Sequence, residues 1–174
     1  AYHHVLQDDA LDSSLRGELL TPPAFEEVVA HLKEVDVSLL EDARDFFRTQ
    51  LGLQLFDTAQ KIYHDLWDKE DHAMNGEAYR RRHLRNICLW LMMKGNENSS
   101  VDTCNEQYMK AKTMTDQIAA LGCLINSSDA SLREQVIADF YSQWAREELV
   151  LDKWFALQAS CELPATLDKV KQLL

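Results

Sequence analysis

Apolar residues recur every three or four positions along most of this chain, which places them on one face of an α-helix. The longest such run predicts one helix of about 28 residues, from Ser38 to Leu66. Its apolar positions are Leu39, Ala43, Phe46, Phe47, Leu51, Leu55, Ala59, Ile62, Tyr63 and Leu66. Ser38 and Glu41 fit a capping box, in which each side chain accepts a hydrogen bond from a free backbone N–H of the first turn.

The same spacing predicts shorter helices on both sides of this long one. They cover residues 5–20 (as one helix, or as two broken near 12–14), 25–32, 77–94, 101–112, 115–125, 131–144, 149–161 and 164–174. Gly52 is expected to be a tolerated weak point. Gly95 is expected to stop a helix through a positive φ. Residues 96–100 are expected to form a loop, Thr113 or Thr115 to cap the next helix, and Ser131 with Glu134 to form a second capping box.

These segments predict an all-α fold of about eight helices. The chain has only three Pro and five Gly among its 174 residues, and no strand pattern competes with the helical one. Short connections between helices favour antiparallel neighbours, so we expect stacked helix pairs that form a solenoid-like α-superhelix. We find no strict repeat period, and we interpret residues 1–174 as a single helical domain.

The segment LVLDKWFALQA, residues 149–159, is strongly apolar and has only three polar side chains, Asp152, Lys153 and Gln158. On a helix, one face would carry Val150, Trp154, Leu157 and Cys161, and the adjacent face Leu151, Phe155 and Ala159. Two apolar faces predict a helix that packs on at least two sides. No nucleophile and base stand together within it, and it carries no set of metal ligands. We therefore interpret the segment as core and not as a working site.

The formal net charge of −11 argues against binding to nucleic acids and to anionic membranes, because both carry negative charge. The one basic cluster, residues 80–85 (RRRHLR), leaves a nucleic-acid-binding module as a minor alternative. We expect it instead to be a solvated helix face paired with carboxylates. No apolar run is long enough for a transmembrane helix.

The residue types that carry chemistry form no recognisable site. Cys88, Cys104, Cys123 and Cys161 show no CxxC spacing, which leaves a zinc site or disulfides as a minor alternative. Cys88, Cys123 and Cys161 stand among apolar residues at helical spacing, so we interpret them as small core residues. The histidines, His3, His4, His31, His64, His72 and His83, form no HExxH or HxH motif. Hydrolase, dinucleotide and P-loop motifs are also missing from the sequence. We assign no catalytic, cofactor-binding or metal-binding residue.

The two ends of the sequence suggest a piece of a longer polypeptide. The chain starts AYHHVLQDD, without Met and without the features of a signal peptide, and it stops inside an apolar stripe. Thiols without disulfide spacing favour the cytoplasm or another reducing compartment. Apolar residues that await further neighbours would make the isolated fragment prone to self-association.

Three stretches resemble a known family when they are taken in order. They are RHLRNICL (82–89), MTDQIAAL (114–121), and the block that runs from ADFY (138–141) through Trp144 to LVLDKWFALQA (149–159). Their order and spacing resemble the C-terminal helical domain of alanyl aminopeptidase, also called aminopeptidase N, of the bacterial, plant and apicomplexan type. The resemblance covers most of residues 1–174, which look like the first part of that domain.

The resemblance implies a role inside a larger enzyme. Such proteins are thermolysin-like zinc aminopeptidases that remove N-terminal residues from peptides. Their zinc ligands and catalytic motifs lie in an upstream catalytic domain, so none can be assigned to this chain. The helical domain is expected to cover the active-site cavity and limit access to peptide substrates. The alternative is a free-standing helical scaffold for protein–protein interaction, marked by an exposed apolar groove.

Overall fold

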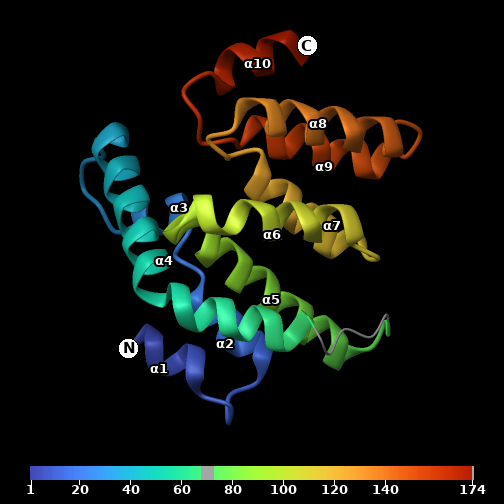
Figure 1. Cartoon of the computed structure of the whole chain (residues 1–174). Coiled ribbons are helices and arrows are strands. Elements are labelled where there is room, and N and C mark those ends of the chain that lie inside the picture. The colour runs from blue at the N-terminus through green and yellow to red at the C-terminus, as the bar shows by residue number, and fades with distance from the viewer. Residues whose placement is uncertain (68–72, 174) are drawn as a thin grey trace. The chain divides into compact units, whose positions relative to one another are not determined.

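The computed structural model describes residues 1–67 and 73–173, which form ten α-helices and no strand (Figure 1). The helices are α1 (Tyr2–Gln7), α2 (Ser13–Leu20), α3 (Phe25–Val29), α4 (Val37–Trp67), α5 (Gly76–Gly95), α6 (Glu97–Lys110), α7 (Met114–Leu124), α8 (Ala130–Trp144), α9 (Glu148–Ala159) and α10 (Thr166–Leu173). The all-α prediction is confirmed. Ten helices in the described residues exceed the expected eight, partly because 5–20 forms two short helices with a break after Gln7.

The helix starts show which capping signals the chain uses. Asp36 accepts from Leu39 N at 3.0 Å at the start of α4, and Asp129 accepts from Ser131 N at 2.9 Å and Leu132 N at 3.0 Å at the start of α8. Both predicted capping boxes are therefore wrong, because a carboxylate already stands upstream, where it also suits the positive end of the helix dipole. Thr113 caps α7, as one of the two predictions had it.

The prediction of a loop at residues 96–100 is also wrong. Only Asn96 leaves helical geometry, and α6 begins at Glu97, four residues before its expected start. The Asn96 side chain accepts from Ser99 N at 3.3 Å, so it satisfies one of the free donors of the new helix. The start of this helix could not be predicted, because its first turn is polar and has no apolar residues at helical spacing.

The chain divides into two compact units, residues 1–100 and 101–174, with the division inside α6. In the first unit α4 packs along α5, α5 also contacts α2, and α1 contacts both α2 and α4. In the second unit α7 packs on α8, α8 on α9, and α9 on α10. The single-domain interpretation of residues 1–174 stays a prediction.

The contact between α4 and α5 is built around two glycines. A Cβ atom added to Gly52 would lie 2.5 Å from Gly95 N, and one added to Gly95 would lie 2.4 Å from Gly52 C and O. Real Cβ atoms do not approach backbone so closely, so the two helices need glycine at both positions. Gly52 is thus a contact point and not a weak point. The helix α5 does end at Gly95, as predicted, but Gly95 has no positive φ, so the expected reason for the stop is wrong. Gly95 serves the packing against α4.

Two further contacts of the first unit involve rings: one ring packs on a glycine, and two others pack on each other. Gly17 of α2 lies against the His83 ring of α5, where an added Cβ would come within 2.6 Å of Cδ2. The Tyr2 ring of α1 meets Phe47 of α4 edge to face, with centroids 6.0 Å apart. Leu51, Leu55, Ala59 and Tyr63 form the buried stripe of α4, whereas residues 37–50 of this helix include no buried residue.

The second unit packs around aromatic side chains whose polar atoms are hydrogen-bonded. Phe140 is fully buried and Tyr108 nearly so. The Tyr108 hydroxyl donates to Asp139 Oδ2 at 2.7 Å and lies 3.3 Å from Val136 O. Trp154 is 8% exposed, and its Nε1 donates to Ile137 O at 3.0 Å, which ties α9 to α8. Figure 1 shows these two helices lying side by side.

The apolar segment on α9 is buried on one side only. Trp154 and Gln158 are buried, whereas Phe155 is 42% exposed, Leu149 is 79% exposed and Ala159 is also exposed. The prediction of two covered faces is therefore wrong within this structure. Trp154 itself confirms the interpretation as core.

Candidate functional surfaces

The arginines of the basic cluster at residues 80–85 make different kinds of contact within the chain. Arg80 pairs with Asp12 at 2.9 Å and Arg81 with Glu77 at 2.6 Å, so for these two the predicted pairing with carboxylates is confirmed. Arg82 and Arg85 are 5% and 1% exposed, which corrects the expectation of a solvated face. Arg82 Nη1 donates to Ala73 O at 3.2 Å, and the Arg85 guanidinium lies 4.8 Å from the centre of the Trp67 ring.

The histidines do not gather into a metal site in the described part of the chain. Across residues 1–67 and 73–173, no three His, Cys, Asp or Glu side chains come close enough to hold a metal ion. His3 Nδ1 contacts Gln7 Oε1 at 3.0 Å, His64 lies against Tyr63, and His83 lies against Gly17. His72 lies outside the described residues. The assignment of no catalytic or ligand residue stays a prediction.

The four cysteines are free thiols in the structure. Cys88 and Cys104 are fully buried, and Cys123 and Cys161 are half-buried. Burial raises the pKa of Cys88 to about 12, partly offset by the charge of Arg16. A hydrogen bond with Cys123, then burial, raises the pKa of Cys104 well above its ordinary value. Buried thiols held in the protonated form are poor nucleophiles, so these two residues act as packing groups.

The second unit has a groove formed by α8, α9 and α10. It consists of a cavity of about 250 Å³ at the start of α10 and a wider hollow of about 520 Å³ beside it. Ile137, Gln158 and Lys169 line both parts, and we call the whole the α8–α10 groove. The wider part also has Ala138, Tyr141, Trp154 and Leu173 in its lining, which makes its floor apolar.

The polar groups at the edge of this groove are engaged within the chain. Lys169 pairs with Glu134, and Arg133 Nη1 donates to Ser127 O. The buried Gln158 amide makes one long contact, from Nε2 to Trp154 O at 3.4 Å. With its charges paired and its floor apolar, the groove suits an apolar partner better than a charged small molecule.

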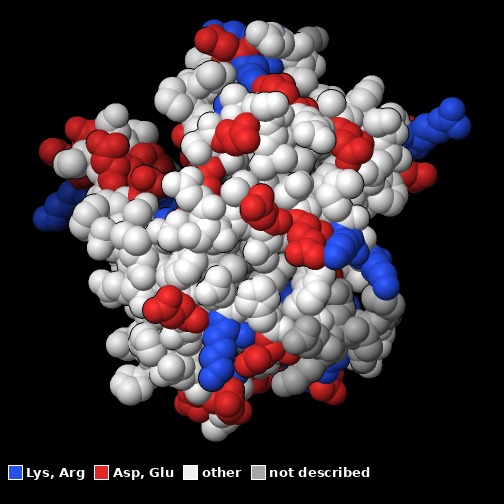
Figure 2. Space-filling model, viewed as in Figure 1, with Lys and Arg blue, Asp and Glu red and all other residues white. Residues whose placement is uncertain are grey.

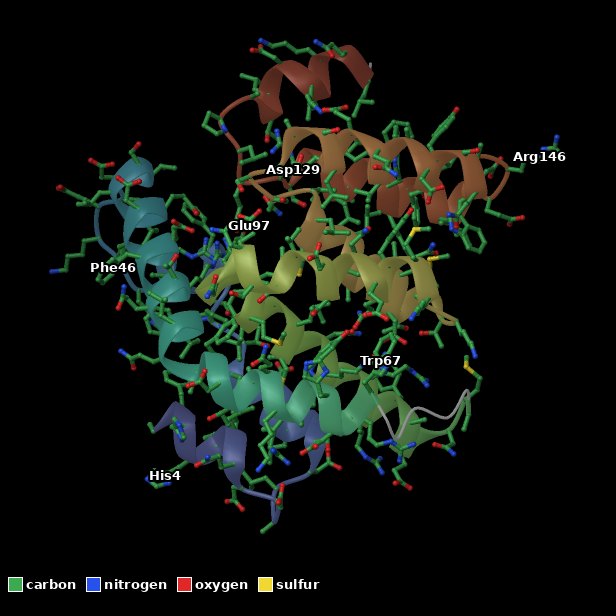
Figure 3. All side chains as sticks on the ribbon, viewed as in Figure 1. His4, Phe46, Trp67, Glu97, Asp129 and Arg146 are labelled. Carbon is green, nitrogen blue, oxygen red and sulfur yellow. The ribbon has the colours of Figure 1, made fainter. Side chains whose placement is uncertain are left out.

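A second exposed apolar surface lies along α4, from Leu39 to Leu53. Leu39, Phe46 and Leu53 are spaced seven residues apart and are 67%, 68% and 51% exposed. Figure 3 shows Phe46 on the outer side of α4. Acidic side chains gather over the same part of the molecule (Figure 2), and Asp42 and Asp45 are among the exposed ones. The spacing of these apolar residues was visible in the sequence, but their exposure was not.

None of the helices in the described residues combines the length and apolar character that crossing a bilayer requires. The expected compartment stays a prediction.

Comparison with known proteins agrees with this all-helical architecture. The family model described as a domain of unknown function (DUF3458_C) with ARM repeats matches residues 1–174. The chain therefore belongs to this family. Although the sequence shows no strict period, the family is described as a repeat domain, and stacked helices are what such a description leads one to expect.

The curated relatives identify the larger proteins in which this region occurs. Aminopeptidase N of Escherichia coli is 29% identical over 174 residues, which is 100% of this chain and 20% of the relative. Aminopeptidase N of Caulobacter vibrioides is 28% identical over 98% of the chain, and that of Haemophilus influenzae 30% identical over 92%. The chain thus spans about a fifth of their length, and it corresponds to their C-terminal helical region, as the sequence resemblance implied.

A solved structure supports the fold. The chain matches the crystal structure of Legionella pneumophila aminopeptidase A in complex with aspartic acid with a TM-score of 0.85 and 21% identity, over 99% of this chain and 21% of that one. At this identity the match carries the architecture of the helices and no more.

Proposed function

We propose that this chain is the non-catalytic helical part of a zinc aminopeptidase that removes N-terminal residues from peptides. The observation that carries the proposal is the match of the whole chain to one region of aminopeptidase N from three bacteria. The described residues offer no cluster that fits a zinc ion. Under this proposal the zinc and the catalytic groups belong to an upstream catalytic domain of the same polypeptide.

We further propose that the chain covers the active-site cavity and limits which peptides enter. The glycine contact between α4 and α5 supports this role, because it locks a 31-residue helix against its neighbour through backbone contact. A cover must hold its shape to exclude bulky substrates and water from a catalytic site. Tight contact between two long helices supplies that stiffness without any catalytic group.

The test uses the full-length polypeptide that carries this chain. We would compare kcat/KM for an alanyl dipeptide with kcat/KM for an unstructured peptide of several tens of residues that begins with alanine. Gly95→Ala should loosen the α4–α5 contact and raise the long-to-short ratio severalfold, while Gly122→Ala, which meets only Leu157 Cδ2 at 3.5 Å, should leave it unchanged. Circular dichroism of each variant shows whether the fold is retained. An unchanged ratio in a folded Gly95→Ala variant would contradict the role as a cover.

A free-standing scaffold for protein–protein interaction is the second candidate. The exposed stripe of Leu39, Phe46 and Leu53 favours it, because large apolar side chains at heptad spacing are a typical surface for another helix. This candidate requires a native polypeptide without an attached catalytic domain. The mass of the native polypeptide separates the two.

A further inference from the structure

We propose that Cys104 of α6 and Cys123 of α7 form a redox-sensitive thiol pair, which hydrogen peroxide converts reversibly into a disulfide. Both residues are free thiols and both belong to the second unit. The proposal does not rest on the proposed function, because it involves neither zinc nor peptide cleavage. It adds a covalent modification site to the helical part of the molecule.

The register between α6 and α7 brings the two thiols together. Gln107 Nε2 of α6 donates to Asp116 O of α7 at 3.0 Å. One turn away on both helices, Cys104 Sγ lies 3.5 Å from Ala120 O. Cys123 follows Ala120 by three residues, so it lies on the same face of α7, one turn beyond the carbonyl that Cys104 contacts. The thiols of Cys104 and Cys123 are hydrogen-bonded to each other.

The different burial of the two thiols assigns their order in the reaction. Cys123 is half-buried, so a small oxidant can reach its sulfur, whereas Cys104 is fully buried. The hydrogen bond with Cys123, then burial, keeps the proton on Cys104 and raises its pKa well above the ordinary value. Cys104 therefore does not react with an oxidant by itself. Its S–H group can instead stabilise negative charge on the sulfur of Cys123, as in other reactive thiol pairs.

The reaction takes two steps, with hydrogen peroxide as the oxidant. In the first, Cys123 Sγ attacks one peroxide oxygen, the O–O bond breaks, and the thiol proton leaves with the other oxygen as water, which gives a sulfenic acid. In the second, Cys104 Sγ attacks the oxidised sulfur, the S–O bond breaks, and the Cys104 proton leaves with the hydroxyl group as water. The two cysteines lose two electrons in total, and one peroxide molecule is reduced to two waters. A dithiol reductant reverses the product by thiol–disulfide exchange.

Proximity offsets the weak nucleophilicity of Cys104. Its sulfur is held against the sulfur that it attacks, so the second step is intramolecular and needs no diffusional encounter. The two sulfurs have to close from hydrogen-bond contact to about 2 Å. Cys161 lacks this advantage, because its thiol donates to a backbone carbonyl, Ile125 O, at 3.3 Å. Since Cys161 is also half-buried, it is the matched control for access of the oxidant.

The experiment oxidises the folded full-length polypeptide and maps its disulfides by mass spectrometry. Hydrogen peroxide is added at increasing doses, free thiols are then alkylated, and the protein is digested with trypsin without reduction. Trypsin cuts after Lys110 and Lys112, between the two cysteines, so a Cys104–Cys123 disulfide joins two separate peptides. The same digest reports how much Cys161 remains alkylated.

We expect the Cys104–Cys123 link to form in roughly tenfold higher yield than any disulfide of Cys161, and to disappear after treatment with dithiothreitol. Three results would overturn the proposal. They are free Cys104 and Cys123 thiols at a dose that oxidises Cys161, a link that forms only after the protein is unfolded in urea, and a disulfide from Cys123 to a different cysteine.

A variant without the second thiol tests the order of the two steps. In Cys104→Ala the sulfenic acid on Cys123 has no partner, so it should persist and react with a dimedone probe severalfold more than in the parent protein. Circular dichroism shows whether the variant folds, and the disulfide map of the parent protein stands without it. Equal dimedone labelling of Cys123 in the parent and in the folded variant would contradict the role of Cys104.

Discussion

The two units of the chain hold their helices together by different means. In the first, α4 and α5 approach until backbone touches backbone at Gly52 and Gly95. In the second, α8 and α9 are held apart by large rings, and the polar atoms of Tyr108 and Trp154 bond to α8. Where backbones touch, an added methyl group is destabilising, whereas in aromatic packing the loss of a ring is destabilising because it leaves a cavity. Opposite kinds of substitution should therefore damage the two units.

The largest effect is expected from Trp154→Ala in the second unit. Removal of this ring leaves a cavity and removes the indole donor to Ile137 O, so we expect the free energy of unfolding to fall by about 3–5 kcal/mol. Phe155→Ala, its neighbour on the exposed side, should cost about 1 kcal/mol or less. Urea unfolding of both variants gives the comparison. Equal losses would mean that α9 is covered on both sides after all.

The converse substitution should damage the first unit. Gly52→Ala forces a methyl group onto backbone atoms of α5 and should cost about 3 kcal/mol, the upper end of overpacking penalties. Gly122→Ala in α7 makes only ordinary contact with Leu157 and should stabilise by up to about 1 kcal/mol, because Ala favours helix. Unfolding midpoints that shift in opposite directions from the parent value would confirm the contrast. Stabilisation by both substitutions would contradict the close contact.

Alkaline pH should weaken the first unit through Cys88. The unfolded thiol loses its proton near pH 9, whereas the folded one keeps it up to about pH 12, so the folded state binds the extra proton between these values. Stability then falls as pH rises, by about 1 kcal/mol per pH unit from this group. The free energy of unfolding should fall less between pH 8 and pH 10 for Cys88→Ala than for the parent protein. Parallel losses in both proteins would exclude Cys88 as the cause.

The smallest of these effects concerns a hydrogen bond in the second unit. Tyr108→Phe keeps the buried ring but removes the hydroxyl that donates to Asp139. Asp139 retains the Gln143 amide as a donor at 2.6 Å, so the expected cost is about 1 kcal/mol. Thermal melting of the variant measures it. A loss as large as that of Trp154→Ala would show that the hydroxyl, and not the ring, organises the core.

The helices themselves could be predicted from the sequence because their apolar stripes follow the period of the α-helix. The long run from Leu39 to Leu66 became α4, and Thr113 capped α7 as one of two options had it. The polar start of α6, which lacks a stripe, escaped, and the break between α1 and α2 lies at residues 8–12 and not near 12–14. Caps were harder to predict, since Asp36 and Ser38 compete for one position and local sequence does not decide between them.

Properties that depend on a neighbouring helix could not be predicted. Glycine at positions 52 and 95 has the same sequence signature whether it weakens a helix or lets another approach it. Arg82 and Arg85 look like surface charges until α4 brings Trp67 to the cluster. The α8–α10 groove was equally hidden. Tyr141 and Trp154 were recognisable as apolar residues, but only the packing of α9 on α8 shows that Trp154 is buried and Tyr141 is exposed.

The most direct test of the central claim is to isolate the native polypeptide that carries LVLDKWFALQA and to measure its mass, zinc content and cleavage of alanyl peptides together. The account predicts a chain of about 100 kDa, because this 20.0 kDa region is 20% of the length of its Escherichia coli relative. It also predicts bound zinc and alanine release that a chelator abolishes. A native chain near 20 kDa, or a long chain without zinc and without alanine release, would contradict the account and make the scaffold the leading interpretation.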